Sequence, residues 1–389
     1  MKQKLKTFDF TLVFTPLLLI CFGIVMIYSA SMVIAVVSYG YESTHFLVKQ
    51  VQWFVIGLFL FLVTSFFNYK RYQKLMKIII FGLILILLSV LAFGKVVNGA
   101  KSWLQIGPFS IQPSEFVKLG LIMYLSSIYS KKQSYISDFN KGVLPPLIMT
   151  GLLLGLIVRQ PDIGTASIIF LIACSVIFSA GIKLKHLTLL ITSGIAIILL
   201  GALSMVNEER IARFTGAYQP FSDPEADGYH LIQSYLAIGT GGFTGQGLGQ
   251  GVQKLGYLSE PHTDFIMAVI AEELGFIGVI FVIGMLSIIV LRGIFISRKC
   301  KDSFGSLLAI GISSMIGIQT FINLGAISGL LPITGVPLPF VSYGGSSLLI
   351  LMMSMGILNN IARKVKVERQ AGETLENEDV FFTKQPKVN

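Results

Sequence analysis

Ten long apolar stretches follow one another along this chain of 389 residues, and they constrain its fold more than any other feature. A helix needs about 20 apolar residues to cross the hydrocarbon core of a bilayer. Segments that reach or nearly reach that length lie at 11–35, 50–67, 76–94, 114–129, 143–158, 163–181, 187–206, 265–291, 304–327 and 345–362. The sequence therefore predicts an all-α polytopic membrane protein with about ten transmembrane helices.

The composition agrees with a membrane protein. Charged residues make up 13% of the chain and hydrophobic residues 53%, so there are too few charges to cover a water-soluble surface. The net charge of +10 is then a signal of membrane orientation, and we expect no nucleic-acid partner. The three cysteines are an odd number and lie in apolar segments or beside a basic run, which argues against a disulfide framework.

Lysine and arginine residues set the orientation. Basic clusters precede the first apolar segment and follow the second, fourth, sixth, eighth and tenth, while the alternate loops are poor in basic residues. Because basic loops stay on the cytoplasmic side, both termini are predicted to be cytoplasmic. Four loops are then outside, the largest of them between the seventh and eighth helices: 36–49, 95–113, 207–264 and 328–344. We expect a transmembrane domain at 1–366 and a disordered cytoplasmic tail at 367–389, where the sequence is polar with mixed charge.

The largest outer loop ends in the strongest candidate for chemistry. Its glycine-rich part, 239–251, leads to His262-Thr263-Asp264 and directly into the next apolar segment. Thr263 or Asp264 could simply cap the helix. Alternatively, Asp264 is a general base that accepts a proton from an attacking hydroxyl. The loop has no GxxxxGK[ST] pattern, so its glycines indicate a backbone close to a ligand, or a re-entrant turn, rather than a nucleotide site.

Two charged residues open the fourth apolar segment. Glu115 and Lys118 have i, i+3 spacing and therefore share one face of a helix, one turn into the membrane. Ionisable groups at such positions are costly and normally face a cavity or a partner. They form a self-satisfied ion pair, or Lys118 contacts a phosphate while Glu115 orients it.

The other candidates also have structural alternatives. Arg210 and Arg213 suit pyrophosphate recognition, or else snorkel to the membrane interface. Asp162 lies at an outer helix break and could cap the following helix. Glu272 and Glu273 lie about two turns below Asp264, and for them a structural role, such as pairing with a lysine, is favoured.

The outer segment 332–347 contains three prolines, which prevent a regular helix. Irregular backbone at membrane depth must be buried in protein or line a cavity, so this segment is predicted to form one wall of a site. Neither His262 nor His230 has partners at metal-ligand spacing, and we expect no zinc site. A loosely held divalent cation near Asp264, Mg²⁺ or Mn²⁺, remains a candidate.

The topology limits the substrates of an enzyme at the outer face. Cytosolic nucleotide sugars do not reach that side, so an activated donor must arrive in the membrane. Lipid-linked pyrophosphates fit, because pyrophosphate is a good leaving group and the lipid tail can lie between helices.

Several motifs occur together in a recognisable order. They lie at 98–104, 112–118, 160–165, 228–229, 233–234, 262–273 and 332–347. With these motifs the chain resembles the SEDS family of cell-wall proteins, the FtsW, RodA and SpoVE type, from about residue 10 to 365. The stretches 228–243 and 253–258 are more similar to FtsW-like members than to RodA. One departure is Ser259-Glu260-Pro261, where the family usually has Pro-Glu-Ala before His-Thr-Asp.

The resemblance implies a peptidoglycan glycosyltransferase that polymerises lipid II and inverts the anomeric centre. It implies that Asp264 is the general base and that undecaprenyl pyrophosphate is the leaving group. We expect seven residues to bind substrate or pyrophosphate: Lys101, Gln112, Glu115, Lys118, Arg210, Arg213 and Ser342. Five more are expected to support the site: Asp162, His262, Thr263, Glu272 and Pro339.

The resemblance also implies partners and a location. The partners are a class B penicillin-binding protein and other division proteins, and the location is the bacterial cell membrane at the division septum. Sporulation and elongation roles stay open. Two alternatives to a polymerase are a lipid II flippase and a non-catalytic division scaffold. The polymerase is favoured because the polar candidates gather at the outer ends of the apolar segments, whereas a flippase needs them near the midplane.

Overall fold

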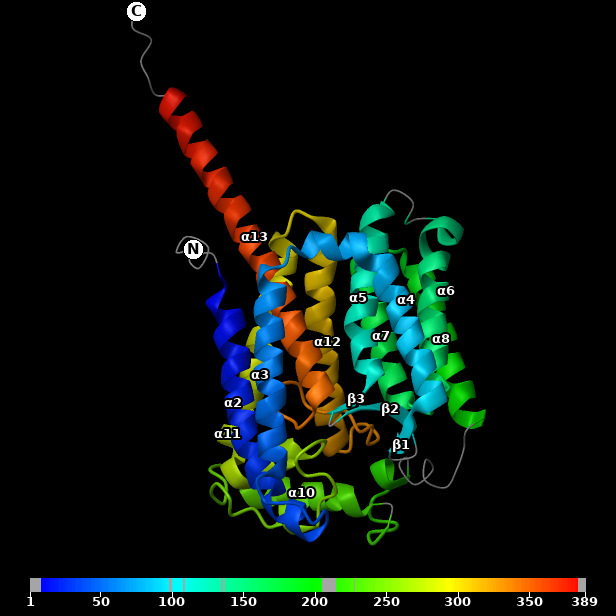
Figure 1. Ribbon diagram of the computed structural model, residues 1–389, viewed down its shortest axis with the longest axis vertical. Helices are drawn as coiled ribbons and strands as arrows, with labels where there is room; N and C mark the ends of the chain where they lie inside the picture. Colours follow the sequence, from blue (N-terminus) through cyan, green and yellow to red (C-terminus); the bar gives the residue numbers. More distant parts are fainter. Residues whose placement is uncertain are drawn as a thin grey trace, which may run out of the picture.

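The computed structural model describes residues 8–97, 100–107, 109–133, 136, 138–204, 215–226 and 228–383 as a bundle of long helices (Figure 1). Ten helices coincide with the predicted apolar segments: α2 (Phe10–Val37), α3 (His45–Phe66), α4 (Tyr69–Phe93), α5 (Pro113–Lys131), α6 (Leu144–Val158), α7 (Ile163–Ser179), α8 (Leu184–Ser204), α11 (Ile266–Lys299), α12 (Ser303–Ile327) and α13 (Gly345–Thr383). Seven described helical segments are long and apolar enough to cross a membrane, with α6 counted together with the π-helical turn Phe139–Val143 that precedes it. The chain is thus a multi-pass membrane protein, while the number of ten crossings stays a prediction.

The two ends of the bundle differ (Figure 1). α2 begins and α13 leaves the bundle at its upper end, whereas the strands and α10 (Tyr229–Gly241) lie at its lower end. The segments that carry the predicted site residues therefore gather at the end away from the chain termini.

A small β-sheet corrects the all-α prediction. The predicted outer loop 95–113 contains β1 (Lys95–Val97), β2 (Ala100–Ile106) and β3 (Phe109–Ile111), paired antiparallel in the order β1-β2-β3. Valine, isoleucine, tryptophan and phenylalanine side chains favour this extended backbone. Gly107, at φ 58°, follows β2 and provides a turn conformation that other residues adopt with strain.

Two further segments differ from the predicted irregular structure. The loop 207–264 contains α10 and a 3-10 turn, Gln253–Leu255; residues 205–214 and 227 lie outside the described residues. α13 continues as a helix to Thr383, through most of the segment expected to be a disordered tail. Lys364 Nζ and Glu368 Oε1 lie 3.6 Å apart. This ion pair at i, i+4 spacing stabilises the helix beyond the apolar region.

Small residues allow close packing at the centre of the bundle. A Cβ on Gly311 of α12 would lie 2.5 Å from Ile122 of α5, and one on Gly356 of α13 would collide with Thr64 of α3. Membrane helices associate through such close contacts, because lipid provides no hydrophobic drive between them. These contacts fix the relative positions of α3 and α13 and of α5 and α12.

Candidate active site

α11, the helix that follows Asp264, is broken at Gly275. This residue has φ 63° and ψ −159°, a region essentially restricted to glycine. A broken helix at membrane depth leaves backbone groups that must find partners within the protein. The glycine-rich loop provides them: Gln246 N donates to Glu272 O at 2.9 Å, and Phe276 N donates to Gly242 O at 3.0 Å.

The glycines of this loop allow it to lie directly against α11. A Cβ on Gly241 would collide with the Ala271 carbonyl, and one on Gly245 would collide with the Glu273 carbonyl. The glycine spacing is therefore explained by packing against a broken helix. The prediction of a close backbone approach was right, but the partner is α11.

Two buried carboxylates fasten the loop to the helices. Lys254, with no exposed surface, donates to Glu273 Oε1 at 2.5 Å and to Ser29 Oγ of α2 at 2.9 Å. Glu272 Oε1 accepts from Val252 N at 2.7 Å. Glu272 thus supports the site through the loop that leads to Asp264.

Asp264 lies just before α11 and is half-buried. The N-cap residue is Phe265, whose side chain makes no capping hydrogen bond. The Asp264 carbonyl accepts from Asn323 Nδ2 of α12 at 2.9 Å, and the same amide donates to Val336 O at 2.8 Å. A Cβ on Gly335 would lie 3.5 Å from Asp264 Oδ2, so the carboxylate faces the proline-rich segment.

That segment braces the backbone before Asp264. Ser342 Oγ donates to Thr263 O at 2.6 Å and accepts from Leu338 N at 2.8 Å, while Tyr343 N donates to His262 O at 2.9 Å. Ser342, which was predicted to bind substrate, joins the Thr263 and Leu338 backbones through its hydroxyl. The proline-rich segment thus lies against the residues that precede Asp264.

His262 is a packing residue in this arrangement. Its ring contacts those of Phe46 and Tyr343, at centroid distances of 4.3 and 5.5 Å, and the latter two rings also contact each other at 5.2 Å. Burial lowers the pKa of His262 to about 4, so the imidazole is neutral at neutral pH. Thr263 Oγ1 donates to the Glu260 carboxylate at 3.0 Å, which stabilises the turn. Pro339 is buried in the proline-rich segment.

The starts of α5 and α7 form the opposite side. Gln112 Nε2 donates to Asp162 Oδ2 at 3.2 Å, and Asp162 Oδ1 accepts from Thr165 N at 3.1 Å as the cap of α7. A Cβ on Gly164 would lie 2.7 Å from Thr334 O, so α7 begins against the proline-rich segment. Gln112 and Asp162 therefore adjoin the segment that Asp264 faces.

Glu115 and Lys118 form a buried ion pair. The distance between Nζ and Oε1 is 2.6 Å, and the side chains are 5% and 1% exposed. An ammonium carries three donors, and among the described residues Glu115 is the only hydrogen-bond partner of Lys118. The other two donors have no partner among the described residues, and the geometry is compatible with both alternatives for this pair.

Three other basic residues were predicted to bind pyrophosphate. Lys101 Nζ donates to Leu91 O at 2.8 Å and Ala92 O at 3.2 Å, so it caps the C-terminus of α4, where a cation is favourable. Binding of substrate by Lys101 stays a prediction. Arg210 and Arg213 lie outside the described residues.

Asn323, Lys254 and Glu273 shape the site but were not selected as site residues from the sequence. Asn323 could have been found, because a polar side chain inside an apolar segment is itself a signal. Lys254 could not, because a lysine in a polar loop is ordinarily solvated.

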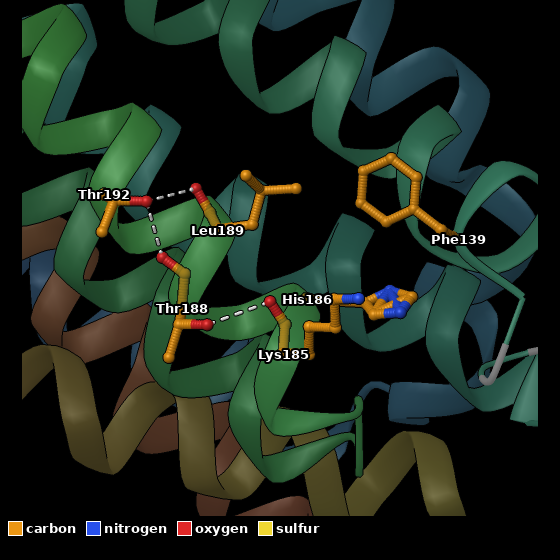
Figure 2. Close-up of a pocket in the computed structure, with 6 residues that line it drawn as sticks. All are labelled: Phe139, Lys185, His186, Thr188, Leu189 and Thr192. Atoms are coloured by element: carbon orange, nitrogen blue, oxygen red, sulfur yellow. Dashed lines mark hydrogen bonds between the residues drawn. The ribbon is translucent and has the colours of Figure 1, made fainter.

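The described residues offer no ready-made metal site at Asp264. No group of three or more histidine, cysteine, aspartate or glutamate side chains there could hold a metal ion. A cavity lies elsewhere, between Phe139 and α8, and Figure 2 shows that the Thr188 and Thr192 hydroxyls lining it bond back along α8. None of the predicted site residues lines it.

Comparisons with known proteins agree with this architecture. The family model for FtsW, RodA and SpoVE, described as cell cycle protein, matches residues 10–367. A Bacillus subtilis protein named probable peptidoglycan glycosyltransferase FtsW is 52% identical over 375 residues, 94% of this chain and 93% of that protein. Stage V sporulation protein E of the same organism is 40% identical over 369 residues, 93% of this chain and 99% of that protein.

Solved structures are similar over most of the chain. One similar chain comes from a structure described as "Structural coordination of polymerization and crosslinking by a peptidoglycan synthase complex". The TM-score is 0.74 and the identity 26%, and the match covers 92% of this chain and 98% of that chain. The Thermus thermophilus rod shape determining protein RodA has a TM-score of 0.68 and 26% identity, covering 92% and 97%.

Proposed function

This chain belongs to the FtsW/RodA/SpoVE family of cell cycle proteins, and we propose that it is a peptidoglycan glycosyltransferase that polymerises lipid II at the outer face of the bacterial cell membrane. The names of its relatives support this activity. The observation that carries the proposal is the half-buried Asp264, held at the end of the bundle away from the chain termini by contacts from α12 and the proline-rich segment.

In the proposed reaction, the 4-hydroxyl of an acceptor N-acetylglucosamine attacks C1 of a donor N-acetylmuramic acid. The new C1–O bond forms as the bond from C1 to the pyrophosphate oxygen breaks, so the anomeric centre inverts. Undecaprenyl pyrophosphate leaves with the bonding electrons, and the hydroxyl proton passes to the Asp264 carboxylate. One base suffices, because pyrophosphate is a good leaving group and needs no general acid to protonate it.

The surroundings of Asp264 suit a base that must be held in place. Its main-chain carbonyl is tied to Asn323, and the preceding carbonyl of Thr263 is tied to Ser342. These bonds restrain the backbone without using the carboxylate. A restrained carboxylate at the membrane surface loses little conformational entropy when the acceptor hydroxyl arrives.

We further propose that Lys118 stabilises the charge that develops on the leaving pyrophosphate. Its two remaining donors support this role, and Glu115 fixes the position of the ammonium. Arg210 and Arg213 are candidates for the same task, because guanidinium groups bind phosphate in bidentate fashion. A divalent cation, if one takes part, would draw most of its ligands from the substrate phosphates and waters, with Asp264 as a protein ligand.

We also propose that the protein works beside a crosslinking enzyme, a class B penicillin-binding protein, with other division proteins at the septum. A neighbouring structure described as a peptidoglycan synthase complex supports the first part. The 52% identity to a protein named FtsW favours division over elongation.

The activity is tested with purified protein, alone and with a class B penicillin-binding protein, given lipid II in detergent. We expect glycan strands in at least one of the two conditions. The same protein in sealed vesicles tests the alternative: movement of lipid II across the bilayer without any polymer would identify a transporter and contradict the proposal.

A further inference from the structure

Gln319 of α12 has a buried carboxamide without a partner. The residue is 1% exposed, and neither Nε2 nor Oε1 has a hydrogen-bond partner among the described residues. A carboxamide removed from water without replacement hydrogen bonds is costly. Gln50 of α3 is a useful contrast, because it is equally buried but its amide lies near Ser342 O and Gly344 N at 3.5 and 3.4 Å.

Helix geometry locates Gln319 beneath Asp264. It lies four residues before Asn323 on the same side of α12, so it is about 6 Å deeper than the side chain bonded to the Asp264 carbonyl. Gly311 and Ile122 are in contact where α12 and α5 run antiparallel. Gln319 lies eight residues after Gly311, and Ser114 lies eight residues before Ile122. Both residues are thus about 12 Å from that contact, in the same direction and at the same height in the bundle. Gln319 is therefore level with the start of α5.

Other unpartnered polar atoms come from the elements around this level. Ser114 Oγ, Thr334 Oγ1 and Asn323 Oδ1 are buried and have no hydrogen-bond partner among the described residues. They belong to α5, the proline-rich segment and α12. α5 packs against α12, and Asn323 of α12 joins the proline-rich segment to the Asp264 carbonyl. Several unpartnered donors and acceptors at this level of the bundle indicate a polar occupant.

The hydrogen-bonding groups of the Gln319 carboxamide limit which chemical group can occupy this place. It presents both a donor and an acceptor, whereas a phosphate can only accept and would leave Oε1 unpartnered. A sugar hydroxyl both donates and accepts, and an acetamido group offers a donor and an acceptor as well. We propose that Gln319 binds hydroxyl or acetamido groups of the sugar that Asp264 acts upon, a substrate-binding role that rests on the proposed function.

The test is Gln319→Met, which keeps the side-chain length and removes both polar atoms. Affinity is measured in an Asp264→Asn background, so that no turnover occurs, with lipid II and with undecaprenyl pyrophosphate, which lacks the sugars. We expect the affinity for lipid II to fall roughly tenfold. The affinity for undecaprenyl pyrophosphate should be unchanged, and the melting temperature should not fall.

Two control variants sharpen the test. Ser126→Ala removes another buried, unpartnered hydroxyl three turns deeper in α5 and should leave both affinities unchanged. Gln50→Met removes a partnered carboxamide and should lower the melting temperature.

Three results would overturn the inference. Equal affinities of Gln319→Met and its parent for lipid II would mean that the carboxamide meets only water. Equal losses for both ligands would assign it to the pyrophosphate, and a lower melting temperature for Gln319→Met would indicate a structural role. Since binding is measured without turnover, a protein that binds lipid II but never polymerises it would contradict the proposed function and leave this test intact.

Discussion

Individual side chains at the end of the bundle away from the chain termini mainly serve to tie irregular backbone in place. Asn323 joins the carbonyls of Asp264 and Val336, and Ser342 joins Thr263 to Leu338. Unpaired backbone groups at membrane depth are costly, so each non-helical segment needs such ties. The precision of the site therefore depends on residues that need not touch substrate.

His262 provides a pH-dependent test at the residue scale. Its pKa falls from an ordinary value of 6.5 to about 4 because it is buried. The unfolded chain takes up a proton below pH 6.5 and the folded protein only below about 4, so stability falls as the pH falls between these values. The full effect is roughly 3 kcal/mol. Replacing His262 with Phe, which fits among the neighbouring rings, should remove this part of the pH dependence.

The measurement is the melting temperature in detergent between pH 7 and pH 4. The melting temperature of His262→Phe should rise relative to that of wild type as the pH falls. A difference that stays constant over the range would show that the imidazole is not held neutral by burial.

Residue chemistry indicated part of the site from the sequence. Glu115 and Lys118 stood out because ionisable groups are rare in apolar segments, and Asp264 because it lies directly before one, after a glycine-rich loop. The substrate-binding roles predicted for Lys101 and Ser342 came from the family resemblance, and the sequence did not show which backbone carbonyls these side chains reach. Their contacts with Leu91 and Thr263 depend on how distant segments pack.

At the scale of elements, the broken helix α11 and the loop packed against it form the central unit. The break at Gly275 exposes backbone groups, and the loop from Gly241 to Lys254 satisfies them and is anchored by Glu272 and Glu273. The loop then continues to Asp264. The position of the catalytic candidate thus depends on the correct docking of the loop.

A glycine pair on α11 tests this dependence. Gly275→Ala forces alanine into a backbone region that costs about 1–3 kcal/mol, and its Cβ would meet the backbone of Gly245 and Phe243. We expect lower thermal stability and loss of polymerisation. The matched control is Gly284→Ala on the same helix, where a Cβ would meet nothing within 4 Å. Ordinary activity in Gly275→Ala would mean that the break is not required.

Apolar length predicted where the ten long helices lie, because about 20 apolar residues are needed to cross the bilayer. It did not predict α10, nor the break in α11, since the apolar sequence resumes directly after Gly275. It also did not predict the sheet at 95–111, whose strands are as short as three residues and are stabilised by pairing with one another.

At the scale of the whole molecule, the bundle separates the chain termini from the candidate site. The chain enters and leaves at one end, and the irregular segments with the polar candidates lie at the other (Figure 1). Basic clusters precede the first apolar segment and follow every second one, so they belong to the end at which the chain enters and leaves. This end is therefore predicted to be cytoplasmic. A glycosyltransferase for a lipid-linked donor needs this separation, because its product is assembled outside the cell.

Cysteine labelling in intact cells tests the orientation. In a background without Cys21, Cys174 and Cys300, an impermeant thiol reagent should label Ser222→Cys in the outer loop. It should not label Lys301→Cys, in the turn between α11 and α12, until the cells are opened. The reverse pattern would invert the topology and place Asp264 inside the cell.

In the proposed reaction, the Asp264 carboxylate accepts the proton of the attacking sugar hydroxyl. The direct measurement is single-turnover polymerisation of lipid II by Asp264→Asn, together with its affinity for lipid II. Asparagine preserves the shape but cannot serve as the base, so we predict that affinity stays within about threefold while polymerisation falls by at least about 100-fold. Polymerisation at the wild-type rate by folded Asp264→Asn would contradict the claim.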